Sequence, residues 1–217
     1  MSDADIVAHF PDQVLASALL PHAFDTSDTA HDIGHLLRVW RNVEKISAVE
    51  GGDLRILQAA TLLHDSVWVD KSSAARNMAS RLAGDKARAV LTGLAWSGEE
   101  IEAVAHAIDA HSFSASITPK TLEARIFQDA DRLDALGMIG VARCLSYSGE
   151  YGRSLYHIGD PAAQSRALDD SRYALDHFQA KLFRLGDMFC TATGQDMARA
   201  RLGRMHRFYD DLMAEIS

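Results

Sequence analysis

Histidine and aspartate side chains occur in three short segments whose other residues follow the apolar spacing of a buried helix face. His35 opens one segment, the pair His64-Asp65 closes the next, and Asp131 lies in "QDADRLDALG" among apolar neighbours. Imidazole nitrogens and carboxylate oxygens bind divalent metal ions, and a metal ion removes the high free-energy cost of burying a carboxylate. Taken singly, each residue is more commonly a hydrogen-bonded or solvated side chain. Taken together, they indicate a metal site in a helical core.

A His-Asp pair is by itself a weak signal. The chain contains two such pairs, His31-Asp32 and His64-Asp65, and its composition alone predicts about one. The first pair precedes the helical segment that starts at His35, so Asp32 is expected to cap that helix and the role of His31 stays open. The metal hypothesis therefore depends on what else converges on His64.

The composition of the chain is that of a soluble globular protein. Its 217 residues, of which 47% are hydrophobic, suffice for one domain with a sizeable core. The formal net charge of −8 argues against binding to a nucleic-acid polymer or a membrane surface, because both require a basic face. The two cysteines, Cys144 and Cys190, argue against a disulfide framework and fit a reducing compartment. Because the sequence shows no signal-peptide pattern and no apolar run of about 18 residues, we expect a cytoplasmic protein.

The pattern along the chain predicts helices and no strand. Helices are expected over residues 35–50, 53–65, 97–111, 118–147 (two helices), 168–185 and 194–215. Asp53 is the predicted cap of the second helix, and Ser97 with Glu100 forms a predicted capping box at the start of the third. The predicted fold class is therefore all-α, in a single domain that spans residues 1–217.

One long segment without helical periodicity interrupts this pattern. Residues 148–166, "SGEYGRSLYHIGDPAAQSR", are rich in glycine, tyrosine and arginine. A compact domain seldom carries so long a loop unless the loop serves as a lid or a binding loop. We therefore expect residues 148–166 to form a flexible cover on the substrate side of the site.

The sequence resembles the HD-domain metal-dependent phosphohydrolases. The matching motifs are "HLLRV" at residues 35–39, "LLHD" at 62–65 and "DADRLD" at 129–134, in the family's order and roughly its spacing. The longer segments "AIDAHSFS", "EARIFQDADRLDALGMIGVAR" and "LDDSRYALDHFQAKL" are similar to the small bacterial YedJ/YpgQ-type branch, and this likeness covers most of residues 25–210. The resemblance implies an HD-domain helical bundle.

The resemblance also implies four metal ligands: His35, His64, Asp65 and Asp131. Asp131 is preferred because the family's final ligand stands directly before Arg-Leu, and Asp129 and Asp134 remain alternatives. Two nitrogen and two oxygen ligands suit Mn²⁺, our expected cofactor, and also Mg²⁺, Fe²⁺, Co²⁺ or Ni²⁺, better than a thiolate-seeking ion. Such an ion lowers the pKa of its bound water from about 15.7 towards about 7, which makes hydroxide available for hydrolysis.

Further roles in catalysis and substrate binding follow from single residues near the motifs. Many relatives carry acidic residues a few positions after His-Asp, whereas this chain has "HDSVWVDK", so the candidates for the general base are Asp65 itself and Asp70. His106 and His111 are five residues apart, which is poor spacing for one helix face, so we prefer a single metal. His111 is then expected to hydrogen-bond a phosphate or the nucleophile, and the role of His106 stays open. Three cations are candidates for binding the phosphates: Lys71, Arg76 and Arg143.

The expected function is hydrolysis of a small phosphorylated substrate, most simply a nucleotide. The resemblance favours deoxynucleoside triphosphates, with water attacking the α-phosphorus and pyrophosphate leaving. A triphosphate needs cations beyond one metal, which the three candidates would supply. The alternatives are a phosphatase acting on nucleoside or sugar monophosphates, a di-iron HD-type oxygenase and a regulatory module without activity. The sequence does not predict an oligomeric state.

Overall fold

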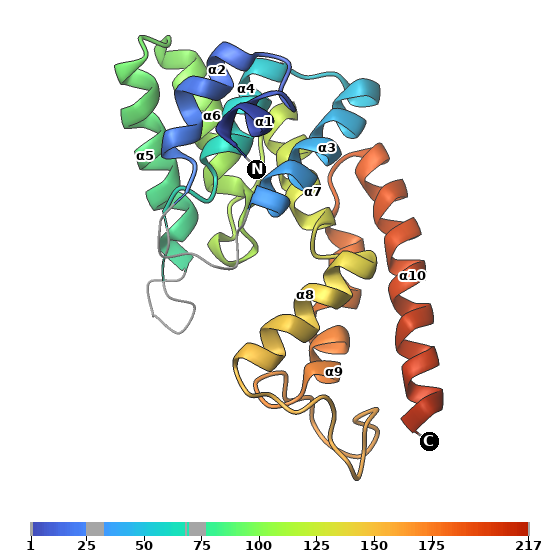
Figure 1. Ribbon diagram of the computed structural model, residues 1–217. Coiled ribbons are helices and arrows are strands. Elements are labelled where there is room, and N and C mark those ends of the chain that lie inside the picture. Colours follow the sequence, from blue (N-terminus) through green and yellow to red (C-terminus); the bar gives the residue numbers. More distant parts are fainter. Residues whose placement is uncertain (1, 25–32, 68, 70–76, 217) are drawn as a thin grey trace. The chain divides into compact units, whose positions relative to one another are not determined.

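The computed structural model describes residues 2–24, 33–67, 69 and 77–216, which form helices joined by loops (Figure 1). No β-strand occurs in this described part of the chain, and an isolated bridge pairs Ser154 with Tyr173. The all-α prediction is thereby confirmed. The chain divides into two compact units, residues 1–131 and 132–217. The single-domain prediction for the whole chain stays a prediction beside this division.

The first unit consists of six helices and most of a seventh. These are α1 Asp3–Val7, α2 Gln13–Leu19, α3 Ile33–Glu50, α4 Leu54–Leu63, α5 Ala79–Gly93, α6 Gly98–His111 and α7 Leu122–Leu133. Short 3-10 turns, η1 Leu20–His22 and η3 Phe113–Ala115, follow α2 and α6. The helices α3, α4 and α6 agree closely with the predictions for residues 35–50, 53–65 and 97–111.

Local backbone chemistry explains where α3 ends and where α4 and α6 begin. Gly51 and Gly52 have φ values of +85° and +94°, in the left-handed region that glycine tolerates, so the backbone leaves the helix there. The Asp53 carboxylate accepts hydrogen bonds from backbone N–H groups in the first turn of α4. Ser97 and Glu100 bond each other's backbone N–H groups at the start of α6. Both predicted caps are confirmed.

Helix α4 is the central helix of the first unit. It packs against α2, α3, α5 and α6, and every residue from Ile56 to Leu63 is buried. Because other helices cover α4 on several sides, its C-terminal end lies in the interior rather than in solvent. His64, the residue after Leu63, is consequently only 3% exposed. The position of α4 therefore explains why a pair of ionisable residues ends an apolar run.

The second unit consists of two long helices and several short turns. These are α8 Gly137–Glu150, α9 Ala174–His177, the π-helical turn η4 Phe178–Leu182, the 3-10 segment η5 Phe183–Met188 and α10 Ala192–Ile216. Helix α8 packs against α9 and α10. The two helices expected over residues 118–147 are confirmed as α7 and α8. The helix expected to start near residue 168 starts instead at Ala174, because Asp169 begins a turn whose carbonyl accepts the Tyr173 N–H.

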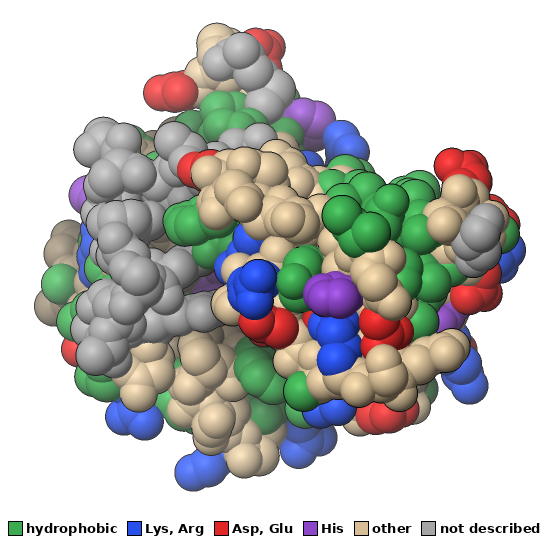
Figure 2. Space-filling model, turned by 90° about the horizontal axis from the view of Figure 1, so that it is seen from below, with side chains coloured by type: hydrophobic (Ala, Val, Ile, Leu, Met, Phe, Trp, Pro, Cys, Tyr) green, Lys and Arg blue, Asp and Glu red, His purple; other side chains and the backbone are tan. Residues whose placement is uncertain are grey.

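Charged side chains are interspersed on the face that Figure 2 shows. Among the described residues there, basic, acidic and histidine side chains are mixed with hydrophobic ones. Separately, none of the described helices is both long enough and apolar enough to cross a membrane.

Candidate metal centre

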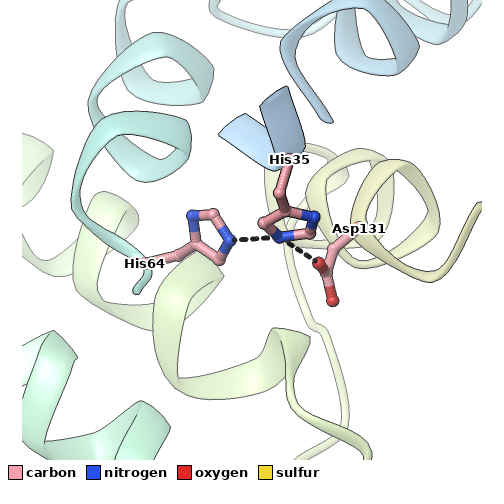
Figure 3. A group of neighbouring side chains, drawn as sticks. All are labelled: His35, His64 and Asp131. Atoms are coloured by element: carbon pink, nitrogen blue, oxygen red, sulfur yellow. Dashed lines mark hydrogen bonds and ion pairs between the residues drawn. The ribbon is translucent and has the colours of Figure 1, made fainter. Parts of the chain in front are cut away.

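Four helices of the first unit bring candidate site residues to one place. His35 lies in the first turn of α3, His64 follows the last residue of α4, His111 ends α6, and Asp131 lies in the last turn of α7. The close-up in Figure 3 shows the side chains of His35, His64 and Asp131 pointing toward one another. Both His35 and His64 are 3% exposed, and Asp131 is half-buried. The group is therefore an interior one with limited access to solvent.

The possible ligand atoms of this group lie close together. Nε2 of His35 is 3.3 Å from Nε2 of His64 and 3.5 Å from Oδ1 of Asp131. One ligand atom from each of these three residues lies within 4.8 Å of the others, so the group could hold a metal ion. Asp65 adds a carboxylate oxygen, because its Oδ2 is 3.0 Å from Nε2 of His64 and 3.4 Å from Nε2 of His35. The structure thus brings the four predicted ligands together.

The ring of His64 is oriented by its second nitrogen. Nδ1 lies 2.9 Å from the carbonyl oxygen of Thr61, and since a carbonyl oxygen only accepts, Nδ1 must carry the proton and donate it. In the neutral ring Nε2 then presents a lone pair, which lies 3.0 Å from the carboxylate oxygen of Asp65. Two acceptors at that distance repel each other unless a cation lies between them. Two imidazole nitrogens with carboxylate oxygens are a donor set that fits a divalent metal ion.

The electrostatics around His64 favour positive charge at the same position. Burial lowers the pKa of His64, but the attraction of Asp65 and, less strongly, of Asp131 outweighs burial, so the pKa is raised overall. The raised pKa means that the carboxylates stabilise a cation where Nε2 points. A proton and a metal ion compete for that lone pair, so acidic pH is expected to weaken metal binding.

Helix ends add to this field, because α4, α6 and α7 all place their C-terminal turns at the group. The last carbonyls of a helix have no intrahelical donor and carry the negative end of the helix dipole. Two of them accept from site histidines: the Thr61 carbonyl from His64 at 2.9 Å, and the Ile108 carbonyl from His111 at 2.6 Å. These bonds orient both rings, and the negative helix ends favour a bound cation.

His111 lies beside the ligand group without belonging to it. Its ring centroid is 5.3 Å from that of His64 in an edge-to-face arrangement, and Phe127 packs against both rings. Burial lowers the pKa of His111, so the ring is neutral at pH 7. Because Nδ1 donates to a carbonyl, Nε2 is the acceptor of this ring. Such a group suits the orientation of a water molecule, and the catalytic role of His111 stays a prediction.

The two alternative aspartates have other surroundings. Asp129 is fully buried within α7, and Asp134 is fully buried in the second unit. Asp134 accepts a hydrogen bond of 2.6 Å from Nη1 of Arg143. A buried carboxylate beside an arginine offsets its positive charge, so the pair attracts a phosphate less strongly than a lone arginine would. The group of side chains that could hold a metal ion contains Asp131, and its assignment as a ligand stays a prediction; Arg143 has a partner other than the predicted substrate.

His106 has a structural contact that the sequence left open. Its Nε2 accepts the backbone N–H of Lys120 at 2.9 Å, which ties the segment before α7 to α6. Burial lowers the pKa of His106, consistent with a neutral acceptor. Five residues named from the sequence lie outside the described residues: His31, Asp32, Asp70, Lys71 and Arg76.

Sequence reasoning missed two buried amide side chains at the site. Nδ2 of Asn42 donates to the Ala130 carbonyl at 2.9 Å, and Nε2 of Gln128 donates to the Ala110 carbonyl at 2.6 Å. Each amide residue is 2% exposed. The only signal in the sequence is an amide within an otherwise apolar helix face, which does not reveal its partner.

Comparisons with known proteins point to one family. The HD domain family model matches residues 32–136, a range that contains all four predicted ligands. YpgQ of Bacillus subtilis (strain 168) is 33% identical over 192 residues, which cover 87% of this chain and 85% of YpgQ. The likeness therefore extends beyond the motifs to most of both chains.

Solved structures give the same result. The crystal structure of B. subtilis YpgQ in complex with ADP has a TM-score of 0.69 and 28% identity, and the match covers 99% of this chain and 97% of that chain. An HD-superfamily hydrolase from Bacillus thuringiensis has a TM-score of 0.67 and 29% identity, with 99% and 98% covered. The Lin1889 protein from Listeria innocua has a TM-score of 0.68 and 27% identity, with 100% and 98% covered.

Proposed function

The chain belongs to the HD-domain family of hydrolases, in the branch that includes YpgQ, and from this premise we propose that it is a metal-dependent nucleotide phosphohydrolase. The favoured substrates are deoxynucleoside triphosphates, cleaved at the α-phosphorus with release of pyrophosphate. The observation that carries the proposal is the group formed by buried His35 and His64 and half-buried Asp131, with the Asp65 carboxylate against it.

These four side chains would hold one divalent ion, for which Mn²⁺ is the first candidate. When bound, such an ion supplies a water molecule whose pKa is lowered towards about 7 and polarises a phosphate oxygen. The protein's own part is to fix the ligands before the substrate arrives. The Thr61 carbonyl sets the ring of His64, and burial restricts both histidines.

The proton of the attacking water needs an acceptor on the protein. His111 would orient the nucleophile, because it is neutral, buried and able to accept at Nε2. Asp65 lies in the ligand group and is the described candidate for the general base. Asp70 is the second candidate for this role. Each assignment gives a carboxylate the task of taking a proton from water that the site holds in place.

The nucleotide part of the proposal is supported by a relative. YpgQ has been crystallised in complex with ADP, a nucleotide with two phosphates. A preference for triphosphates needs cations beyond the metal, and the ion pair of Arg143 with Asp134 occupies one of the three candidates. A phosphatase acting on nucleoside or sugar monophosphates, which needs fewer cations, is therefore the second candidate function.

The di-iron oxygenase alternative gains no support from the described residues. That part of the chain contains one group of side chains that could hold a metal ion. His106, which lies between the second and third motifs, accepts a backbone N–H instead. Hydrolysis at a single metal is the simpler proposal.

The test is to incubate the Mn²⁺-loaded protein with dATP and, separately, with dAMP, and to identify the products by chromatography. We expect dAMP and pyrophosphate from dATP. Release of nucleoside and phosphate from dAMP, with dATP untouched, would replace the triphosphate proposal with the phosphatase. Absence of hydrolysis of any nucleotide or sugar phosphate with Mn²⁺, Mg²⁺, Co²⁺ or Ni²⁺ would contradict the proposed function altogether.

A further inference from the structure

Asn42 is a polar residue on the buried face of α3. It is 2% exposed and its neighbour Val43 is fully buried. Seven residues make about two helical turns, so Asn42 and His35 lie on the same side of α3. A buried amide is unfavourable unless its donors and acceptors are hydrogen-bonded. What Asn42 bonds therefore indicates what the amide contributes.

The bond of Asn42 reaches the peptide group that carries a predicted ligand. Nδ2 of Asn42 donates to the carbonyl of Ala130 at 2.9 Å, in the last turn of α7. The Ala130 carbonyl and the Asp131 nitrogen belong to one planar peptide unit. The Ala130 carbonyl lies in the last turn of α7, and the Asn42 amide supplies it with a side-chain donor. The bond consequently fixes the orientation of the peptide plane between Ala130 and Asp131, and with it the direction in which the Asp131 side chain leaves the backbone.

The same bond joins two helices that each supply a ligand. His35 comes from α3 and Asp131 from α7, and their ligand atoms are 3.5 Å apart. A small rotation of either helix would separate these atoms by more than the tolerance of a metal–ligand bond. Asn42 resists that rotation because it lies two turns after His35 on α3 and donates to Ala130 on α7, the residue next to Asp131.

A second amide continues the link from α7 to α6. Nε2 of Gln128 donates to the Ala110 carbonyl at 2.6 Å, next to His111. Ala110, like Ala130, lies in the last turn of its helix. Two buried amides therefore tie α3 to α7 and α7 to α6 at the level of the ligand group, and Asn42 provides the link that joins two ligand-bearing helices.

Gln58 is a matched residue with a different partner. It is a fully buried amide on α4, the helix that precedes His64. Its Nε2 donates to the Asp12 carbonyl at 2.7 Å, and its Oε1 accepts the Asp12 N–H at 3.3 Å. It therefore holds the cap residue of α2 and bonds no peptide next to a ligand. A substitution of Gln58 therefore serves as a control, because it should lower the stability of the core without affecting the metal site.

We propose that Asn42 is a positioning residue of the metal site, holding His35 and Asp131 at the separation that binds a divalent cation. This inference rests on the metal site in the proposed function. It adds a residue that lies outside the ligand set and acts through backbone geometry. Loss of the amide should weaken metal binding about tenfold, as loss of groups that orient ligands does elsewhere.

The experiment compares the metal-free full-length wild type with Asn42→Leu, Asn42→Ala and the control Gln58→Met. Each protein is titrated with Co²⁺, whose visible absorption spectrum reports the ligand geometry and whose titration curve gives the affinity. Thermal unfolding of each metal-free protein is measured in parallel. Asn42→Ala is included because it is the milder substitution, and either folded Asn42 variant suffices for the comparison.

We expect the Asn42 variants to bind Co²⁺ about tenfold more weakly than the wild type, with a changed spectrum. Gln58→Met should unfold at a lower temperature and keep the wild-type affinity and spectrum. Wild-type affinity and spectrum in a folded Asn42 variant would overturn the inference alone. An equal loss of affinity in Gln58→Met would also overturn it, because general loosening of the core would then explain both. If the wild type itself binds no Co²⁺, the metal site and this inference fail together.

Discussion

Each unit of the chain has carboxylates that are buried or half-buried, and the groups that face these carboxylates differ in kind. In the second unit Asp176 is fully buried and accepts three hydrogen bonds. Arg166 donates two of them, at 2.5 and 2.7 Å, and the backbone N–H of Asp169 donates the third at 2.6 Å. The hydrogen-bond donors to this carboxylate all belong to the protein. The ion pair of Arg166 with Asp176 therefore holds the loop between α8 and α9 in place.

In the first unit the carboxylates of Asp65 and Asp131 instead face imidazole nitrogens. Because Nδ1 of His64 donates to the Thr61 carbonyl, Nε2 of the neutral ring is an acceptor, and it lies 3.0 Å from the carboxylate oxygen of Asp65. Such a group attracts a cation that the protein does not supply. Burial of a carboxylate is therefore no sign of function by itself. The chemistry of its neighbours distinguishes a structural ion pair from a metal site.

The largest effect is expected from removing a ligand. His64→Ala and Asp131→Ala should each lower the rate of nucleotide hydrolysis by more than about a hundredfold, because one of four ligands is lost. The metal-free variants should remain folded. Each substitution removes one of several polar groups that face one another without a bound cation, so it takes away little stabilising contact. The measurement is the initial rate with Mn²⁺, beside thermal unfolding of the metal-free proteins.

His106→Ala is the matched control, because His106 lies in the same unit and bonds a backbone N–H outside the ligand group. It should retain most of the hydrolysis rate. A rate near that of the wild type in either ligand variant would show that the group of His35, His64, Asp65 and Asp131 is not the catalytic site.

A smaller effect of the opposite kind is expected in the second unit. Asp176→Asn replaces a carboxylate by an amide whose NH₂ group opposes the Arg166 guanidinium, so the midpoint of thermal unfolding should fall by several degrees. The affinity for Mn²⁺, measured by calorimetry, should be unchanged. If Asp176→Asn lost metal affinity as His64→Ala is expected to, the division between structural and metal-binding carboxylates would be wrong.

The response to acid should also reveal the structural carboxylate. Burial would raise the pKa of Asp176, but Arg166 and the Asp169 N–H outweigh it and lower the pKa below the ordinary 3.8. Because the unfolded chain binds this proton more tightly, Asp176 stabilises the fold above pH 3.8 and loses that contribution as the pH falls through the lowered value. The unfolding midpoint of the wild type should therefore fall more steeply below about pH 4 than that of Asp176→Asn. Parallel slopes for the two proteins would contradict this assignment.

The smallest effect concerns the loop between α8 and α9, which was expected to be a flexible cover. The Asp160 carboxylate accepts the backbone N–H groups of Gln164 and Ser165, which lower its pKa to about 2. We expect ADP with Mn²⁺ to slow proteolytic cleavage within this loop only modestly, because these internal bonds already hold it. Equal cleavage rates with and without ADP would leave the loop as a connector.

How far the sequence predicts this molecule depends on the range of the interactions involved. Caps such as Asp53 and Ser97 are local and were predicted, as were the types and positions of the candidate ligands. The partners of Asn42 and His106 were not predictable, because each bond joins segments brought together only by tertiary packing. A helix starting near residue 168 was wrong because a side-chain-stabilised turn around Asp169 displaced its beginning to Ala174.

The pairing of Asp134 with Arg143 shows the same limit at shorter range. The two residues are nine positions apart, but the chain turns between α7 and α8, so a helical projection does not bring them together. Sequence reasoning could therefore count Arg143 as a free cation for phosphate, whereas the fold gives it a buried carboxylate partner.

The most direct test of the central claim is the metal content of the protein after loading with Mn²⁺ and removal of free ions. Elemental analysis should give about one equivalent per chain for the wild type and for Asp176→Asn, and a small fraction of that for His64→Ala and Asp131→Ala. This result would show that the acceptor group in the first unit holds the cation. Full metal content in His64→Ala and Asp131→Ala, or none in the wild type, would contradict the account.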